Sequence, residues 1–193
     1  PPPEPAMTLL ILGLILWWAT HLFPLMAAGR RDAFAAQIGD GPYKGAYSLI
    51  SVGAMILTII GYQNAAFVNV WQPPAWGVHL NNLMMLIAVG LFAASHSKGN
   101  AKRVVRHPML LSVIVWAAAH LLVNGDQASL VLFGGYGAWA AAAIFAANAR
   151  DGAWIKPAPA PRKKDWLLVA ITLAAFLVFT AIHAWLGIWP FPG

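Results

Sequence analysis

The amino-acid sequence predicts an all-α membrane protein with about six transmembrane helices and both termini on the side opposite the cytoplasm. Of its 193 residues, 60% are hydrophobic and 9% are charged, which is too little charge to cover a water-soluble domain. All 12 Lys and Arg residues lie in three stretches, at positions 30–44, 98–106 and 150–164. These stretches are every second gap between apolar segments. Basic residues beside transmembrane helices stay in the cytoplasm, so the alternation predicts an even number of crossings.

Six segments are apolar enough to cross a membrane, whose hydrocarbon core of about 30 Å requires roughly 20 apolar residues. The first lacks a positively charged start and is too long for a signal peptide, so we expect it to remain in the folded protein. Residues 1–6 are expected to form a disordered extension or a tag remnant, and residues 7–193 a single transmembrane domain. The predicted segments are residues 7–26, 43–65, 78–95, 109–123, 128–147 and 166–188.

The last three segments each carry a local signal. The fourth is short and follows Pro108, which suits the first turn of a helix. The gap 124–127 after it is tight, so the fourth and fifth segments are predicted to form an antiparallel hairpin. The fifth has small residues at four-residue spacing, which favours close helix packing and can also make room for a flat cofactor. The polyproline-like linker 156–161 predicts a loosely attached sixth helix.

The composition excludes several kinds of site. The chain has no cysteine, so disulfides, thiolate metal sites and cysteine nucleophiles are absent. The net charge of +6 comes from basic residues placed as topological anchors, which predicts contact with anionic membrane lipid and no binding of nucleic acid. The six Asp and Glu residues all lie outside the predicted helices, which argues against an intramembrane proton relay and against paired-carboxylate hydrolysis.

Six histidines remain as candidates for chemistry. An imidazole inside a membrane is costly unless it binds a metal or finds a hydrogen-bond partner, so the histidines within apolar segments are the informative ones. His79 begins the third segment. His96 and His107 lie at cytoplasmic ends beside basic residues, where interfacial roles are favoured over catalysis. The histidines within apolar segments are His21, His120 and His183.

Among the six histidines, His120 is the strongest candidate for a ligand-binding or metal-binding residue. It lies four residues after Trp116, hence on the same helix face, and the three intervening alanines leave its surroundings open. Two interpretations are about equally supported by the residues alone. The imidazole either binds a ligand or metal, or it is a buried side chain bonded to a carbonyl or to Trp139.

The motif around His120 resembles a known family. Residues 106–111 read Arg-His-Pro-Met-Leu-Leu, and residues 116–126 read Trp-x-x-x-His-Leu-Leu-x-Asn-Gly-Asp. Both are similar to the NnrU family of bacterial membrane proteins, which is related to 15-cis-zeta-carotene isomerase of plants and algae. His21 with the downstream Arg30, and Trp71-Gln72 with Gly77-Val78-His79, also resemble that pattern.

The resemblance implies a multi-pass protein of the bacterial inner membrane, so the far side on which the Lys and Arg pattern places both termini is the periplasm. It implies a b-type haem whose iron is bound by His21 and His120. It also implies a role in redox or nitrogen-oxide-linked metabolism, or in isomerisation of a polyene, with a carotenoid-type ligand. In the isomerase a cysteine stands three residues before the second haem-binding histidine. Ala117 occupies that position here, so a cysteine ligand switch cannot operate.

Helix depth favours a different partner for His120. The predicted topology places His21 in the cytoplasmic half of the membrane and His120 in the outer half, roughly 10–15 Å apart in depth. By depth, His79 and His183 are better neighbours of His120, so His79 is a second candidate cofactor-binding residue. A rival function also stays open, that of a non-catalytic accessory subunit of a larger respiratory or photosynthetic membrane complex. If the protein is an enzyme, the resemblance implies a haem-dependent, isomerase-like one.

Overall fold

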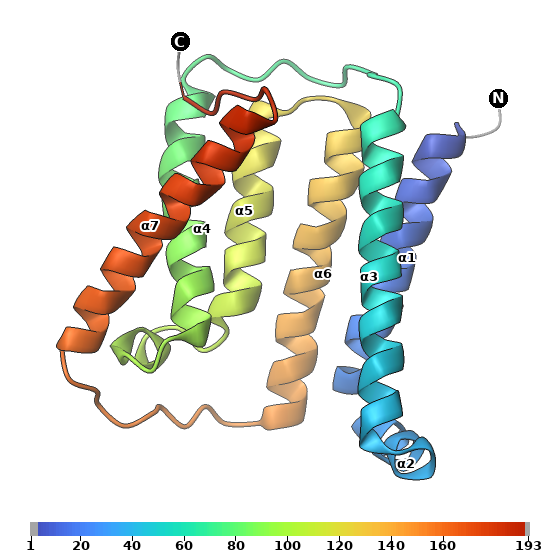
Figure 1. Cartoon of the computed structure of the whole chain (residues 1–193), viewed down its shortest axis with the longest axis vertical. Coiled ribbons are helices and arrows are strands. Elements are labelled where there is room, and N and C mark those ends of the chain that lie inside the picture. Colours follow the sequence, from blue (N-terminus) through green and yellow to red (C-terminus); the bar gives the residue numbers. More distant parts are fainter. Residues whose placement is uncertain (1–3, 192–193) are drawn as a thin grey trace. The chain divides into compact units, whose positions relative to one another are not determined.

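The computed structural model describes residues 4–191, and the regular secondary structure of this part of the chain is helical (Figure 1). Seven α-helices and one short 3₁₀ helix follow one another, and the described residues contain no strand, only one isolated β-bridge between Asn69 and Asp126. The helices are α1 (Pro5–Met26), α2 (Ala28–Ile38), α3 (Asp40–Asn64), α4 (Gly77–His96), η1 (Asn100–Arg103), α5 (Pro108–Val123), α6 (Gln127–Asp151) and α7 (Lys163–Trp185).

The all-helical prediction is confirmed, and each predicted apolar segment corresponds to one helix. Five helices of the described chain are long and apolar enough to span a membrane, namely α1, α3, α4, α6 and α7. Helix α5 is apolar but has only 16 residues, fewer than a perpendicular crossing requires. The number of crossings and the side on which the termini lie therefore stay predictions. Helix α1 begins at Pro5, two residues before the expected boundary, and residues 1–3 of the expected extension lie outside the described residues.

One helix was not predicted. The gap between the first two apolar segments contains α2, which has 11 residues and carries Arg30 and Arg31. Its low hydrophobicity hides it from a search for apolar segments, but its polar side chains fit an interfacial position. Gly39 ends α2 with a positive φ of 91°, a conformation that favours glycine. The Arg31 guanidinium lies 5.7 Å from the ring centre of Tyr43, which ties α2 to the start of α3.

The described chain divides into two compact units, each of which is considered by itself. Unit 1 contains α1, α2, α3 and α6, and unit 2 contains α4, η1, α5 and α7. The expected single transmembrane domain therefore stays a prediction. The border falls at Gly125 and Asp126, within the gap that was expected to join an antiparallel hairpin. That hairpin stays a prediction too, because its helices belong to different units.

Unit 1 is held together by close contact between helix backbones. A Cβ atom at Gly61 of α3 would overlap the backbone nitrogen of Leu10 in α1, so only glycine permits this approach. Leu10 is fully buried and lies in a core with Leu14 and Ala128. Helix α6 packs on α1, and the Trp18 indole donates to the carbonyl of Gly135 at 3.1 Å. The small residues of α6 thus serve helix packing at this point.

Unit 2 is built on α4, which packs against both α5 and α7. Helix α7 has no buried residue, as a loosely attached helix would. Its start is nevertheless fastened by Asn100 of η1. The Asn100 side chain exchanges hydrogen bonds with the backbone of Ala160 in the linker, and Asp165 accepts from the backbone and side-chain nitrogens of Asn100 at 2.8 and 2.6 Å. The polyproline-like linker is therefore held at its end by Asn100, while the loose attachment of α7 stays a prediction.

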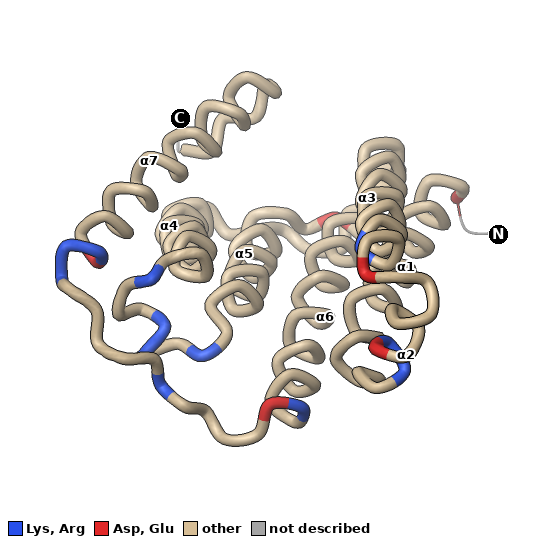
Figure 2. Tube along the Cα trace, turned by 60° about the horizontal axis from the view of Figure 1, so that its bottom comes forward, with Lys and Arg blue, Asp and Glu red and all other residues tan. Residues whose placement is uncertain are grey.

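Charge is segregated within each unit (Figure 2). In unit 1 the basic residues lie on α2, at the start of α3 and at the end of α6. In unit 2 they lie between α4 and α5 and around the start of α7. Each unit thus keeps its Lys and Arg residues at one end of its long helices, and the side of the membrane on which that end lies stays a prediction.

Candidate functional site

Three histidines within apolar helices share one local geometry. In each, Nδ1 faces the backbone carbonyl of the residue four positions earlier in the same helix. A carbonyl only accepts hydrogen bonds, so Nδ1 carries the proton and Nε2 of the neutral ring keeps a lone pair. Metal-binding histidines are commonly oriented by this kind of bond. The pairs are His21 with Trp17 at 3.0 Å, His120 with Trp116 at 2.9 Å, and His183 with Phe179 at 2.8 Å.

In α1, α4, α5 and α7 an aromatic residue lies one turn before a histidine. The ring centres of Trp116 and His120 are 5.2 Å apart, and those of Phe92 and His96 are 5.3 Å apart. The spacing of an aromatic residue and a histidine four residues later therefore occurs in α1, α4, α5 and α7. This spacing can be read directly from the sequence, but the prediction used only the pair Trp116 and His120.

His21 lies in an aromatic cluster of unit 1. Its ring stacks on Trp17 with centres 3.8 Å apart and planes inclined by 19°. Trp139 of α6 meets it edge-on at 5.5 Å, and Tyr47 of α3 lies at 5.3 Å. Sequence reasoning missed Trp17 and Tyr47, and it considered Trp139 only as a partner of His120. These residues are brought to His21 by helix packing.

Two donors of this cluster have no acceptor. The indole nitrogens Nε1 of Trp17 and Trp139 are buried and make no hydrogen bond with any described residue. Trp139 is 7% exposed, so bulk water does not compensate for the loss. A buried donor without a partner costs free energy, and such groups in native proteins call for an explanation. Together with the lone pair of His21, they fit a ligand that carries acceptor atoms.

The residues after His120 in its motif have structural roles. Asn124 ends α5, because its backbone and side-chain nitrogens both donate to the carbonyl of His120, at 2.9 and 2.8 Å. At Gly125 a Cβ atom would overlap the carbonyl oxygen of Trp71, so only glycine fits. Asp126 caps the start of α6 by accepting from the backbone of Ser129 at 2.9 Å. The side chain of His120 takes no part in these contacts, so they leave its role open.

The candidate partners of His120 divide between the units. His79 and His183 belong to the same unit as His120, whereas His21 belongs to the other. The imidazoles of His120 and His183 lie close enough to repel each other electrostatically, and nothing shows that they bond. His79 lies in the first turn of α4 and is exposed. The pairing of His21 with His120 stays a prediction, and within unit 2 the structure favours His183 over His79.

The donor chemistry fits a haem better than a bare metal ion. The described residues contain no group of three or more His, Cys, Asp or Glu side chains that can hold an ion. A porphyrin brings its own equatorial nitrogens, so the protein needs to supply only one or two axial ligands. Histidines whose proton is fixed on Nδ1, with the lone pair on Nε2, meet this requirement.

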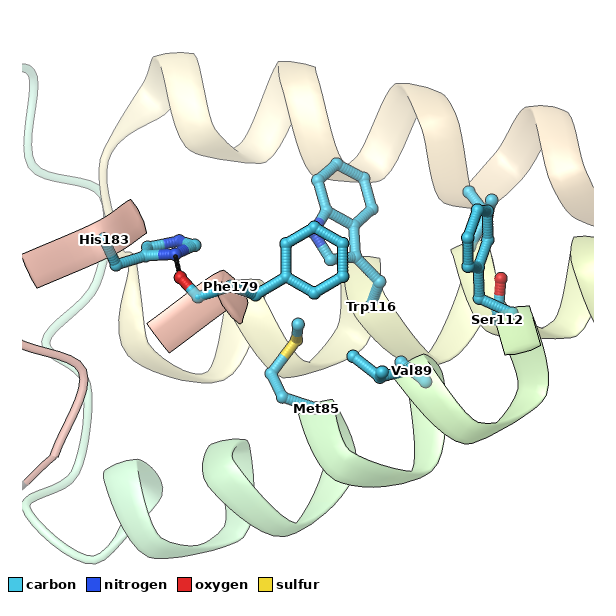
Figure 3. A pocket seen from close by; sticks show the side chains of 9 residues that line it. Met85, Val89, Ser112, Trp116, Phe179 and His183 are labelled. Atoms are coloured by element: carbon cyan, nitrogen blue, oxygen red, sulfur yellow. Dashed lines mark hydrogen bonds between the residues drawn. The ribbon is translucent and has the colours of Figure 1, made fainter. Parts of the chain in front are cut away.

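Unit 2 also contains a cavity of about 220 Å³, which lies between α4, α5 and α7. Figure 3 shows His183 at one end and Ser112 at the other, with the rings of Phe179 and Trp116 between them. His183, Ser112 and the indole nitrogen of Trp116 are the polar side-chain groups among the lining residues. The lining residues are Met85, Ala88, Val89, Phe92, Ser112, Val113, Trp116, Phe179 and His183.

The comparisons with known proteins identify one family. The profile of a family described as NnrU protein matches residues 9–190, nearly the whole chain. No curated protein and no solved structure matches the chain significantly.

Proposed function

This chain belongs to the NnrU protein family, a family of membrane proteins, and we propose that it is a multi-pass protein of the bacterial inner membrane that binds b-type haem. In the proposed topology α5 crosses together with the five longer helices, and both termini are periplasmic. His120 would supply the first protein ligand to the haem iron. His21 is the proposed second ligand, on the strength of the resemblance to the haem-binding isomerase.

One observation supports the haem above the others. The Nδ1 proton of His120 is bound to the carbonyl of Trp116 at 2.9 Å, so the ring is held in the tautomer whose Nε2 can bind a metal. The sequence also allowed His120 to be a buried histidine bonded to a carbonyl. That bond is present at Nδ1, and it is compatible with a metal at Nε2. Within its own unit, His21 shows the same local geometry.

The residues around these histidines have definite tasks in this proposal. A bound haem supplies reversible one-electron redox chemistry at its iron. The backbone carbonyls of Trp17 and Trp116 fix the orientation of the imidazoles. The stacked ring of Trp17 excludes water from one face of His21, and the unpaired indole donors of Trp17 and Trp139 offer hydrogen bonds to acceptor groups of a ligand. The reaction served is redox or nitrogen-oxide-linked metabolism, with polyene isomerisation as the second possibility.

The difference spectrum of the purified protein, reduced minus oxidised, tests the proposal. A low-spin haem gives an α-band in the reduced state, and its loss in His120→Ala identifies the ligand. A protein without haem that copurifies with one stable large partner contradicts the proposal and supports the accessory-subunit function instead.

A further inference from the structure

We propose that the cavity between α4, α5 and α7 binds a lipid-soluble phenol, the chemical class to which isoprenoid quinols belong. The proposal concerns unit 2 alone and does not depend on haem binding. It rests on the hydrogen-bond character of the cavity, its aromatic walls and the position of His183 along α7 (Figure 3).

Two polar side chains of the cavity, His183 and Ser112, offer acceptors and no spare donor, while the indole of Trp116 carries one N–H. Nδ1 of His183 donates to the carbonyl of Phe179 at 2.8 Å, which leaves Nε2 of the neutral ring as an acceptor. Oγ of Ser112 donates its one proton to the carbonyl of Met109 at 2.7 Å, which leaves its lone pairs. A ligand that pairs with either group must therefore bring an O–H or N–H. A ketone or an ether cannot do so.

The walls of the cavity select an aromatic and uncharged ligand. Phe92, Trp116 and Phe179 present rings, and Met85 presents a thioether, which makes favourable contacts with aromatic rings. No charged side chain lines the cavity. Its volume of about 220 Å³ is below the range of roughly 300–1,000 Å³ usual for drug-sized ligands. It therefore suits a single substituted ring, with the tail of the ligand left in the bilayer.

The position of His183 fits a ligand with a polar head and an apolar tail. His183 lies two residues before α7 ends at Trp185, whereas the basic residues Lys163 and Lys164 lie at the opposite end of the helix. The hydroxyl of the ligand would thus lie close to the outer surface and its tail toward the membrane interior. Phe179 is 43% exposed and α7 has no buried residue, so this wall of the cavity is open to lipid. A membrane-dissolved ligand can reach it sideways.

The test uses two probes that differ in one donor, para-nonylphenol and its methyl ether. Binding to the full chain in detergent micelles is measured by titration calorimetry, with empty micelles as the blank. We expect the phenol to bind about tenfold more tightly than the ether, the value of one hydrogen bond to the imidazole. His183→Phe should abolish this difference while it keeps the apolar walls. Ala88→Leu, which fills the cavity, should weaken both probes, and Ala174→Leu at an exposed site of α7 should weaken neither.

Three outcomes overturn the proposal. Equal affinity for the two probes means that the cavity holds an apolar chain only, such as a lipid tail. A preference for the phenol that survives in His183→Phe places the acceptor elsewhere. Absence of saturable binding above the micelle blank removes the site altogether. Thermal unfolding of each variant checks that it is folded. His183→Phe changes a side chain that is not buried, so it remains informative even if Ala88→Leu does not fold.

Discussion

The indole ring of Trp17 stacks on the imidazole of His21, with ring centres 3.8 Å apart and planes inclined by 19°. The carbonyl of the same tryptophan residue accepts the Nδ1 proton of that imidazole. Trp17 thus fixes both the plane and the tautomer of His21. This arrangement leaves one ring nitrogen, Nε2, for any ligand.

Removal of His120 should remove the haem. His120→Ala takes away the proposed axial ligand at a position where the neighbouring alanines Ala117 and Ala119 are buried and offer no substitute. His96→Ala is the matched control, because His96 also follows an aromatic residue by four positions but lies exposed at the end of α4. We expect the haem spectrum of purified His120→Ala to be lost or strongly changed and that of His96→Ala to be normal. An unchanged spectrum in His120→Ala would falsify the assignment.

The second axial ligand should be His21. In that case His21→Ala converts a six-coordinate low-spin iron into a five-coordinate one, whereas His79→Ala has little effect, because His79 is exposed in the first turn of α4. Absorption and electron paramagnetic resonance spectra of the two variants measure the coordination. If His79→Ala gives the five-coordinate iron and His21→Ala has little effect, His79 is the second ligand. An iron that stays six-coordinate in both variants points to His183, whose imidazole interacts electrostatically with His120.

The chain should cross the membrane six times. The segregation of Lys and Arg places Gly99 in the cytoplasm and the C-terminus in the periplasm, which requires the 16-residue α5 to cross. Reporter domains fused at Gly99 and at the C-terminus should therefore be active in opposite compartments. If both report the same compartment, the number of crossings is odd and α5 does not span.

Gly61→Ala should destabilise unit 1. The added methyl group would overlap the backbone nitrogen of Leu10, so α1 and α3 must move apart, at a cost of about 1–3 kcal/mol. Gly53→Ala is the control in the same helix, because a Cβ atom at Gly53 meets nothing within 4 Å. Thermal unfolding in one detergent compares the two variants. Equal stability would show that the α1–α3 contact is not as close as described.

Asn100→Ala should release the linker before α7. The substitution removes both side-chain bonds to the backbone of Ala160 and the side-chain bond to Asp165. We expect limited proteolysis to cleave the linker several times faster than in the wild type. The control is Asn64→Ala, because the Asn64 side chain bonds only within its own helix, to the carbonyl of Ile60. A cleavage rate unaffected by Asn100→Ala would mean that the linker is protected by other contacts.

The sequence predicted the apolar helices because hydrophobic length is a local property, and it missed α2 because that helix is polar. The sequence also singled out the candidate histidines, because they lie in or next to apolar segments. Their environment was not predictable in the same way. The ring of Trp139 reaches His21 only because α6 packs on α1, and Asn100 meets Asp165 across 65 residues of sequence. Contacts of this kind depend on tertiary packing, which cannot be read from the spacing of residues in the sequence.

Because the chain divides into two units, the order in which its helices are synthesised decides when unit 1 can be completed. Unit 1 receives α1, α2 and α3 first, but its remaining helix, α6, emerges from the ribosome only after α4 and α5. The glycine-mediated pair of α1 and α3 can therefore form in the nascent chain before α6 is made. His21 meets the ring of Trp139 only once α6 has arrived. A chain truncated after Val123 should thus reach the membrane with α1 and α3 paired but with the His21 cluster incomplete.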